Sequence, residues 1–167
     1  MSADNQQERL KTLGWIVGFV DGEGTFSLSV FRNKTSKLGW QVFPEFVITQ
    51  RENGLKALQE AKQFFDCGQI YVNRRFDNHR VPIYRYCVRN IKDLRNKIVP
   101  VFQRFPLKTS KKTDFNLFSE ALDLMDAKKH LASQGIKLLA EIAERMNRKK
   151  RSAFLGSSET LRQTTYS

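Results

Sequence analysis

Two acidic residues occupy a position where a negative charge needs a partner. Asp21 and Glu23, in the segment Asp-Gly-Glu-Gly, directly follow the apolar stretch 13–20. That stretch predicts a helix, and the carbonyl end of a helix disfavours negative charge. A cation beside these carboxylates would stabilise them, and Mg2+ prefers oxygen ligands of this kind. The pattern is consistent with a metal site for phosphate chemistry. Taken alone, a solvated acidic turn is the commoner explanation of such a tetrapeptide.

Glycines recur at every fourth position of the same stretch, at Gly14, Gly18 and Gly22. Each costs about 1 kcal/mol in a helix relative to alanine, so three in a row need a reason. One explanation is the close approach of a second helix. The other is a helix packed tightly on its own sheet, and the spacing leaves both open. If two such helices crossed at the glycines, their Glu23 side chains would lie close together on a twofold axis, where metal ions could serve both strands of a duplex.

The composition indicates a folded domain with a polyanionic partner. The 167 residues are 40% hydrophobic, and 29 Lys+Arg against 17 Asp+Glu leave a net charge of +12. Nucleic acid is the natural partner of such a chain, because each neutralised phosphate releases condensed counterions. Basicity that serves only solubility is the alternative, and charge alone names no function.

The two cysteines and the N-terminus indicate the compartment. Cys67 and Cys87 have no zinc-ligand spacing, and they favour two unpaired thiols in a reducing environment over one disulfide. The N-terminus carries neither a basic nor an apolar export signal, and residues 13–20 are too short to span a bilayer. We expect an intracellular protein without a membrane partner, in the cytoplasm of a prokaryote or the matrix or stroma of an organelle.

Hydrophobic periodicity predicts an α+β fold. Residues 8–21 predict a helix, and its stretch 13–20 is apolar on every side and therefore expected to be buried all round. The elements expected after it are strands at 25–31 and 40–50, a helix capped by Asn53, a hairpin of 69–75 and 83–89, a helix capped by Asn90 and interrupted by Pro100, and helices at 112–127 and 133–147. The order α-β-β-α-β-β-α, with extra C-terminal helices, predicts a four-stranded antiparallel sheet with helices on one face and a ligand on the other.

Residues 15–24, Trp-Ile-Val-Gly-Phe-Val-Asp-Gly-Glu-Gly, resemble the LAGLIDADG motif of homing endonucleases. Segments at 44–50, 105–115 and 130–150 match the family in the same order, so the resemblance spans about residues 10–151. We expect residues 1–151 to form the endonuclease domain and 152–167 a flexible Ser/Thr-rich tail. The motif occurs once, as in the single-motif class, which works as a homodimer.

The resemblance implies a role at each matching position. Glu23 corresponds to the acid that binds the metal, with the Gly22 carbonyl beside it, and Asp21 to the more structural first acid. Gln50 and Lys108 correspond to the pair that positions water and stabilises the charge developing on the phosphate. Without the resemblance, Gln50 would be an ordinary strand end and Lys108 one basic residue among many. The implied cofactor is Mg2+, with Mn2+ or Ca2+ able to substitute for binding. The implied dimer interface comprises Gly14, Trp15, Gly18, Asp21 and Gly22.

The family's sheet lies in the major groove of DNA, so strand alternation predicts the contacts. If Gln50 sets the register, the residues expected to face DNA in the first hairpin are Ser27, Ser29, Gln41 and Glu45. Those expected in the second are Tyr71, Asn73, Arg75, Arg85 and Arg89, whose amides and guanidinium groups suit base edges. Phe31 and Phe43 fit this face poorly, and Pro44 could bend the strand and flip the register. The basic residues expected at phosphates, or merely solvated, are Lys111, Lys112, Arg148, Lys149 and Lys150.

The resemblance implies a homodimeric homing endonuclease that binds a long near-palindromic site of double-stranded DNA and hydrolyses both strands across the minor groove. Two alternatives use the same scaffold: a maturase that binds intron RNA, and a DNA-binding regulator without cleavage. Retention of Glu23, Gln50 and Lys108 together favours the enzyme, since a binding protein needs none of them.

Overall fold

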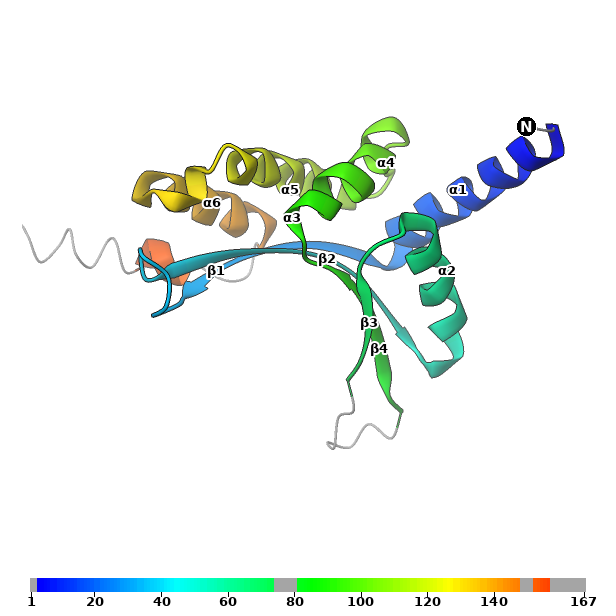
Figure 1. The fold of residues 1–167 in the computed structure, drawn as a ribbon, viewed down its shortest axis with the longest axis horizontal. Coiled ribbons are helices and arrows are strands. Elements are labelled where there is room, and N and C mark those ends of the chain that lie inside the picture. The colour runs from blue at the N-terminus through cyan, green and yellow to red at the C-terminus, as the bar shows by residue number, and fades with distance from the viewer. Residues whose placement is uncertain (1–2, 74–80, 148–151, 157–167) are drawn as a thin grey trace, which may run out of the picture. The chain divides into compact units, whose positions relative to one another are not determined.

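The computed structural model describes residues 3–73, 81–147 and 152–156 and has the predicted order of elements (Figure 1). Its strands are β1 (Gly24–Arg32), β2 (Trp40–Arg51), β3 (Gln69–Asn73) and β4 (Ile83–Val88). Its longer helices are α1 (Ala3–Glu23), α2 (Leu55–Phe65), α5 (Lys111–Asp126) and α6 (Ser133–Met146). The shorter ones are η1 (Glu52–Gly54), α3 (Ile91–Asp93), the π-helical turn η2 (Leu94–Ile98), α4 (Val99–Arg104) and η3 (Lys129–Leu131).

The four strands form one sheet in the order β1-β2-β4-β3. The antiparallel register pairs Ile48 with Tyr86 and Thr49 with Arg85, and it pairs Tyr71 with the same Arg85. Directly opposite residues share a face, so odd-numbered residues of the strands lie on one side, called here the odd face. Even-numbered residues such as Ile48 and Tyr86 are fully buried on the other side. β2 runs through Pro44 as one unbroken strand, and Val42, Phe46 and Ile48 are all buried.

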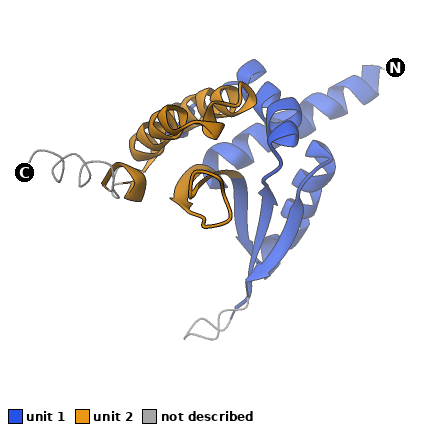
Figure 2. Cartoon of the chain, turned by 60° about the vertical axis from the view of Figure 1, so that its left-hand side comes forward, with its two compact units in different colours: residues 1–25, 46–112 blue, residues 26–45, 113–167 orange. Residues whose placement is uncertain are grey.

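The chain divides into two compact units (Figure 2): unit 1 contains residues 1–25 and 46–112, and unit 2 contains residues 26–45 and 113–167. In unit 1 an aromatic cluster joins the even side of the sheet to its helices, with the Phe46 ring 5.7 Å from Phe65 of α2 and 6.2 Å from Phe102 of α4. In unit 2 the Phe26 ring lies 5.3 Å from Phe115 and 5.4 Å from Phe118, both on α5. Within each unit the helices therefore pack on the even side, as the pattern predicts.

Two local predictions are confirmed and one is wrong. The Asn90 side chain accepts hydrogen bonds from the backbone N–H groups of Lys92 and Asp93, and Pro100 lies in the first turn of α4, just after the π-helical turn. Asn53 does not cap α2. The chain forms the turn η1 directly after β2, Asn53 lies inside that turn, and Gly54 precedes α2.

The start of the expected tail is packed. The Phe154 ring lies 5.0 Å from Trp40, and the Ser152 N–H donates to Glu144 at 2.7 Å. These contacts hold residues 152–156 within unit 2, and the rest of that segment lies outside the described residues. Cys67 and Cys87 are both free, as expected. In the described part of the chain, every helix is too short or too polar to cross a lipid bilayer.

Candidate active site and nucleic-acid interface

The first helix is exposed along most of its surface. Only Ile16 and Val20 are buried in α1, so the prediction of a helix buried all round is wrong. Trp15 is 38% exposed, although its ring stacks on Phe19 at 5.2 Å. The stretch 13–20 is apolar, yet part of its surface stays exposed in a single chain, and an exposed apolar helix surface indicates a contact with a partner.

The glycine stripe lies on that open face. At about 100° per residue, Gly14, Gly18 and Gly22 fall opposite Ile16 and Val20. A Cβ atom added at any of these glycines would meet no described atom within 4 Å. The stripe is therefore not the contact of α1 with its own sheet, which removes one of the two explanations that the spacing left open.

The helix ends two residues later than the predicted range 8–21. α1 continues through Gly22 to Glu23, and β1 begins at once with Gly24. A Cβ at Gly24 would lie 2.7 Å from Val20 Cγ1 and 2.8 Å from the Val20 carbonyl oxygen. Gly24, rather than Gly22, is thus the glycine that the change from helix to strand requires.

Asp21 anchors the segment that carries Lys108. Its carboxylate accepts hydrogen bonds from the Lys108 N–H at 2.9 Å, from the Thr109 N–H at 3.2 Å and from the Thr109 hydroxyl at 2.6 Å. Burial raises the pKa of Asp21, but the bonds from Thr109 and Lys108 and the charge of Lys111 outweigh it, so the pKa lies below its ordinary value. Asp21 thereby joins the end of α1 to residues 108 and 109.

Glu23 has the opposite environment. Its side chain is exposed, and it forms no hydrogen bond or ion pair with another described residue. The Lys108 side chain is exposed as well, while its backbone is fixed beside Asp21. The structure therefore brings Lys108 to the end of α1 that carries Gly22 and Glu23.

Gln50 lies on the side of β2 opposite to the residues predicted to face DNA. It pairs with Tyr84 and so lies on the even side of β2, opposite to Thr49. A Cβ at Gly54 would lie 2.6 Å from Gln50 Oε1, which shows that the side chain folds over Gly54. Gln50 is therefore not a guide to the DNA-facing parity.

The second hairpin presents the expected polar residues on the odd face. Tyr71 and Arg85 form one row with Thr49, and Asn73 belongs to the next row with Arg51. The Arg89 guanidinium, just beyond β4, lies 5.0 Å from the centre of the Tyr71 ring. Thr49 and Arg51 were missed by the sequence analysis, and counting in twos from Gln41 would have found them. Arg75, Arg148, Lys149 and Lys150 lie outside the described residues.

The residues of the first hairpin that are predicted to face DNA differ in their exposure. Ser29 is exposed, and the hydroxyl of Ser27 donates to the Glu45 carbonyl at 3.3 Å. Glu45 itself is only 8% exposed. The prediction that Glu45 faces DNA is wrong, because its side chain is buried within the protein.

Lys111 has a structural contact that the sequence did not reveal. Its ammonium group donates to the Val20 carbonyl at 3.0 Å, which satisfies one of the free carbonyls at the end of α1. The expected phosphate contact of Lys111 is therefore not its role in this structure, whereas Lys112 is exposed and remains available.

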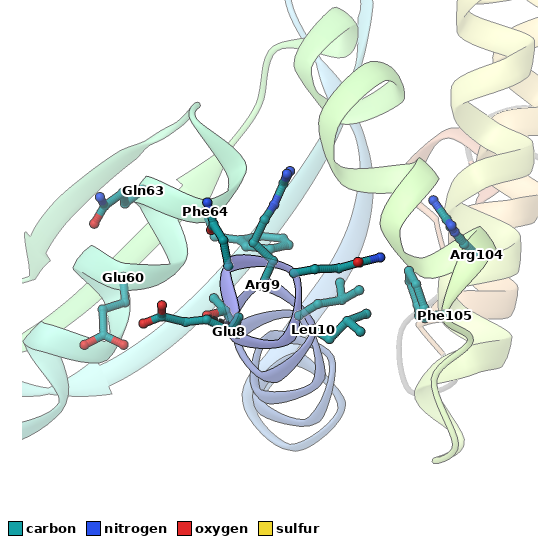
Figure 3. A pocket seen from close by; sticks show the side chains of 12 residues that line it. Glu8, Arg9, Leu10, Glu60, Gln63, Phe64, Arg104 and Phe105 are labelled. Carbon is teal, nitrogen blue, oxygen red and sulfur yellow. Dashed lines mark hydrogen bonds between the residues drawn. The ribbon is translucent and has the colours of Figure 1, made fainter. Parts of the chain in front are cut away.

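A hollow in unit 1 lies away from this chemistry (Figure 3). Figure 3 shows α1 end-on, with Glu60 and Phe64 of α2 on one side and Arg104 and Phe105 at the end of α4 on the other. The hollow contains none of the predicted catalytic or DNA-contacting residues. This hollow therefore adds nothing to the predicted site at the end of α1.

Comparisons with known proteins agree on one family. The profile of the family described as LAGLIDADG endonuclease matches residues 16–122. A Neurospora crassa protein named "Probable intron-encoded endonuclease 3" is 34% identical over 155 residues, which cover 92% of this chain and 27% of that protein. The chain spans about a quarter to a third of the length of this and two further curated relatives.

Solved structures have a similar fold. The crystal structure of the homing endonuclease I-TnaI has a TM-score of 0.77 and 36% identity, and the match covers 89% of this chain and 96% of that one. The structure of I-SmaMI bound to uncleaved DNA target in the presence of calcium ions has a TM-score of 0.76 and 28% identity, covering 85% of this chain and 47% of that one.

Proposed function

Since the chain belongs to the LAGLIDADG endonuclease family, we propose that it is a homing endonuclease that pairs with a second copy of itself, binds a long near-palindromic site of double-stranded DNA and hydrolyses both strands with Mg2+. As with the relatives named intron-encoded, its reading frame lies in an intron, and the joined flanking sequence is its target.

The observation that carries the proposal is an open glycine stripe that leads to an exposed acid on the same helix. Gly14, Gly18 and Gly22 leave room for another backbone, and Glu23 stands at the end of the stripe without a partner among the described residues. A second copy crossing α1 at the glycines would bring two Glu23 carboxylates together. Neither feature makes a contact of this kind with the described residues of its own chain.

The residues at the end of α1 fit a divalent cation. The described residues contain no group of three or more His, Cys, Asp or Glu side chains that could hold a metal ion. One chain therefore offers the Glu23 carboxylate and the Gly22 carbonyl. Such a set suits Mg2+, which takes one or two carboxylates and completes its coordination with water and substrate phosphates. When bound, the ion supplies positive charge against the phosphate that undergoes hydrolysis.

The remaining roles belong to groups of this chain. Lys108, whose backbone Asp21 fixes, directs its ammonium group at the charge that develops on the phosphate. Gln50 supplies an amide that orients the attacking water, a role that rests on the family resemblance alone. The odd face contacts base edges, with Tyr71, Arg85 and Thr49 in one row.

The test begins with the joined sequence that flanks the reading frame, or with a duplex selected from a random library. The protein should cleave both strands with Mg2+ and should bind without cleaving when EDTA is present. Glu23→Gln should keep the affinity and lower the cleavage rate by about a thousandfold, the scale of losing one major electrostatic group. Glu141→Gln, an exposed acid on α6, is the matched control and should cleave normally. Cleavage by the Glu23→Gln variant at the normal rate would refute the metal assignment, and failure to bind any duplex would refute the function.

A further inference from the structure

An aromatic and amide patch lies near the turn between β1 and β2, entirely within unit 2. Its members are Phe31 of β1 and Gln41 and Phe43 of β2, all on the odd face. Neither ring suits a surface that should contact DNA through polar groups. The chemical groups that the patch presents define what it can bind.

The hydrogen bonds around Gln41 fix which end of its amide is engaged and which end is left without a partner among the described residues. The Thr35 backbone N–H, which can only donate, bonds to Asn33 Oδ1 at 3.0 Å, and the Thr35 hydroxyl donates to the same atom at 2.7 Å. Asn33 must therefore point its Nδ2 group the other way, where it donates to Gln41 Oε1 at 2.6 Å. With its oxygen engaged in this way, Gln41 presents its Nε2 hydrogens, for which no described residue supplies an acceptor.

The two rings form an apolar surface beside that donor. Phe31 is 42% exposed, and its ring meets Phe43 edge-on at 6.3 Å between centres. Phe43 and Gln41 are two positions apart on β2, so their side chains project from the same face as neighbours. The patch thus offers one hydrogen-bond donor adjacent to an apolar surface.

We propose that this patch recognises a thymine in the major groove, with Gln41 Nε2 donating to O4 and the Phe31 and Phe43 rings contacting the 5-methyl group. Thymine alone combines an acceptor with a methyl group on its major-groove edge. Cytosine presents a donor there and no methyl group, adenine presents a donor beside its acceptor, and guanine presents acceptors only. The inference rests on the proposed function, since it specifies a base within the site that the endonuclease binds.

The first experiment removes the methyl group alone. A duplex selected by the full-length protein should contain a fixed thymine in each half-site whose replacement by uracil weakens binding by about fourfold, the effect of one buried methyl group. Phe31→Ala should weaken binding to the thymine duplex by a similar factor and should abolish the difference between thymine and uracil. Uracil at the other thymine positions of the site is the control.

The second experiment reverses the hydrogen bond. In Gln41→Glu one carboxylate oxygen still accepts from Asn33, and the other faces the base as an acceptor. Cytosine offers a donor at the equivalent position, so the ratio of thymine to cytosine affinity at that base pair should fall by about tenfold or more. Asn33→Ala removes the hydrogen bond that engages the Gln41 amide oxygen. The freed amide can then both donate and accept, so the base preference should broaden to include adenine.

The outcomes separate the two claims. Suppose that the protein selects and cleaves a site, but that uracil in place of thymine does not weaken binding and neither Phe31→Ala nor Gln41→Glu changes the base preference. That result would overturn the thymine assignment and leave the endonuclease proposal standing. Failure to select any duplex would overturn both. A shift from thymine to cytosine at one base pair, with no change elsewhere in the site, would support the assignment.

Discussion

The end of α1 contains an anchored region and a presented region, and they are built differently. The anchored region comprises Asp21 with Lys108, Thr109 and Lys111, and hydrogen bonds join it to the rest of unit 1. The presented region comprises the glycine stripe and Glu23, which have no such contacts within the described chain. Two acids only two positions apart thus serve different purposes: one holds the loop in place, and the other is left open for a ligand. Substitutions in the two regions should therefore affect different measurements.

The largest effect is expected for Gly18→Leu in the presented region. The added side chain should raise the dimer dissociation constant by roughly 100-fold, because overpacking costs about 1–3 kcal/mol and a symmetric interface carries the change twice. Analytical ultracentrifugation measures the constant, and cleavage should fall with the dimer. Thr12→Leu, at an exposed position of α1 away from the stripe, is the matched control. An unchanged dissociation constant for Gly18→Leu would show that the stripe is not the interface.

A smaller effect is expected for Asp21→Asn in the anchored region. The asparagine amide group would face the donors of Lys108 and Thr109, so the free energy of unfolding should fall by about 2 kcal/mol. Glu23→Gln should leave that free energy within about 0.5 kcal/mol of the original, as for most exposed positions. Urea denaturation measures both variants. Equal losses would mean that the two acids are not distinguished in this way.

The acid dependence of stability should reveal the same anchor. The pKa of Asp21 in the folded protein lies below the ordinary value of 3.8. A lowered pKa stabilises the folded state at pH values above the unfolded pKa, and this contribution is lost as the pH falls through the folded pKa. The difference in unfolding free energy between the original protein and Asp21→Asn should therefore be constant near neutral pH and shrink below about pH 4. A difference that grows on acidification would contradict the lowered pKa.

The smallest effect is expected for Thr109→Val, which removes one hydroxyl from the anchor. The variant loses only the side-chain bond to Asp21 Oδ1 and a longer bond from the Lys111 N–H. The free energy of unfolding should therefore fall by about 1 kcal/mol. Thr113→Val, at an exposed position of α5, is the control in the same denaturation experiment. A loss as large as that of Asp21→Asn would mean that the hydroxyl, rather than the backbone amides, holds the carboxylate.

The sequence predicted the order of elements, and it predicted that odd-numbered residues of the strands lie on the side of the sheet away from the helices. Both predictions succeed because period-two alternation and helical spacing are local properties of the chain. It placed Glu45 among the DNA contacts incorrectly, since alternation specifies a face and not whether neighbouring side chains cover it. It also placed Lys111 at a phosphate, because basic residues look alike in a sequence. The bond to the Val20 carbonyl joins residues 91 positions apart and has no local signature.

By itself the sequence determined the family, through the motif at 15–24, and the chemistry available at Glu23 and Lys108. Only the tertiary structure decided that the glycine stripe faces away from its own sheet, that Asp21 rather than Glu23 is bound within the chain, and that Gln41 presents its donor. The physical reason is the same in each case. Residue types set which hydrogen bonds and contacts are possible, whereas the fold decides which of them are already satisfied and which remain for a partner.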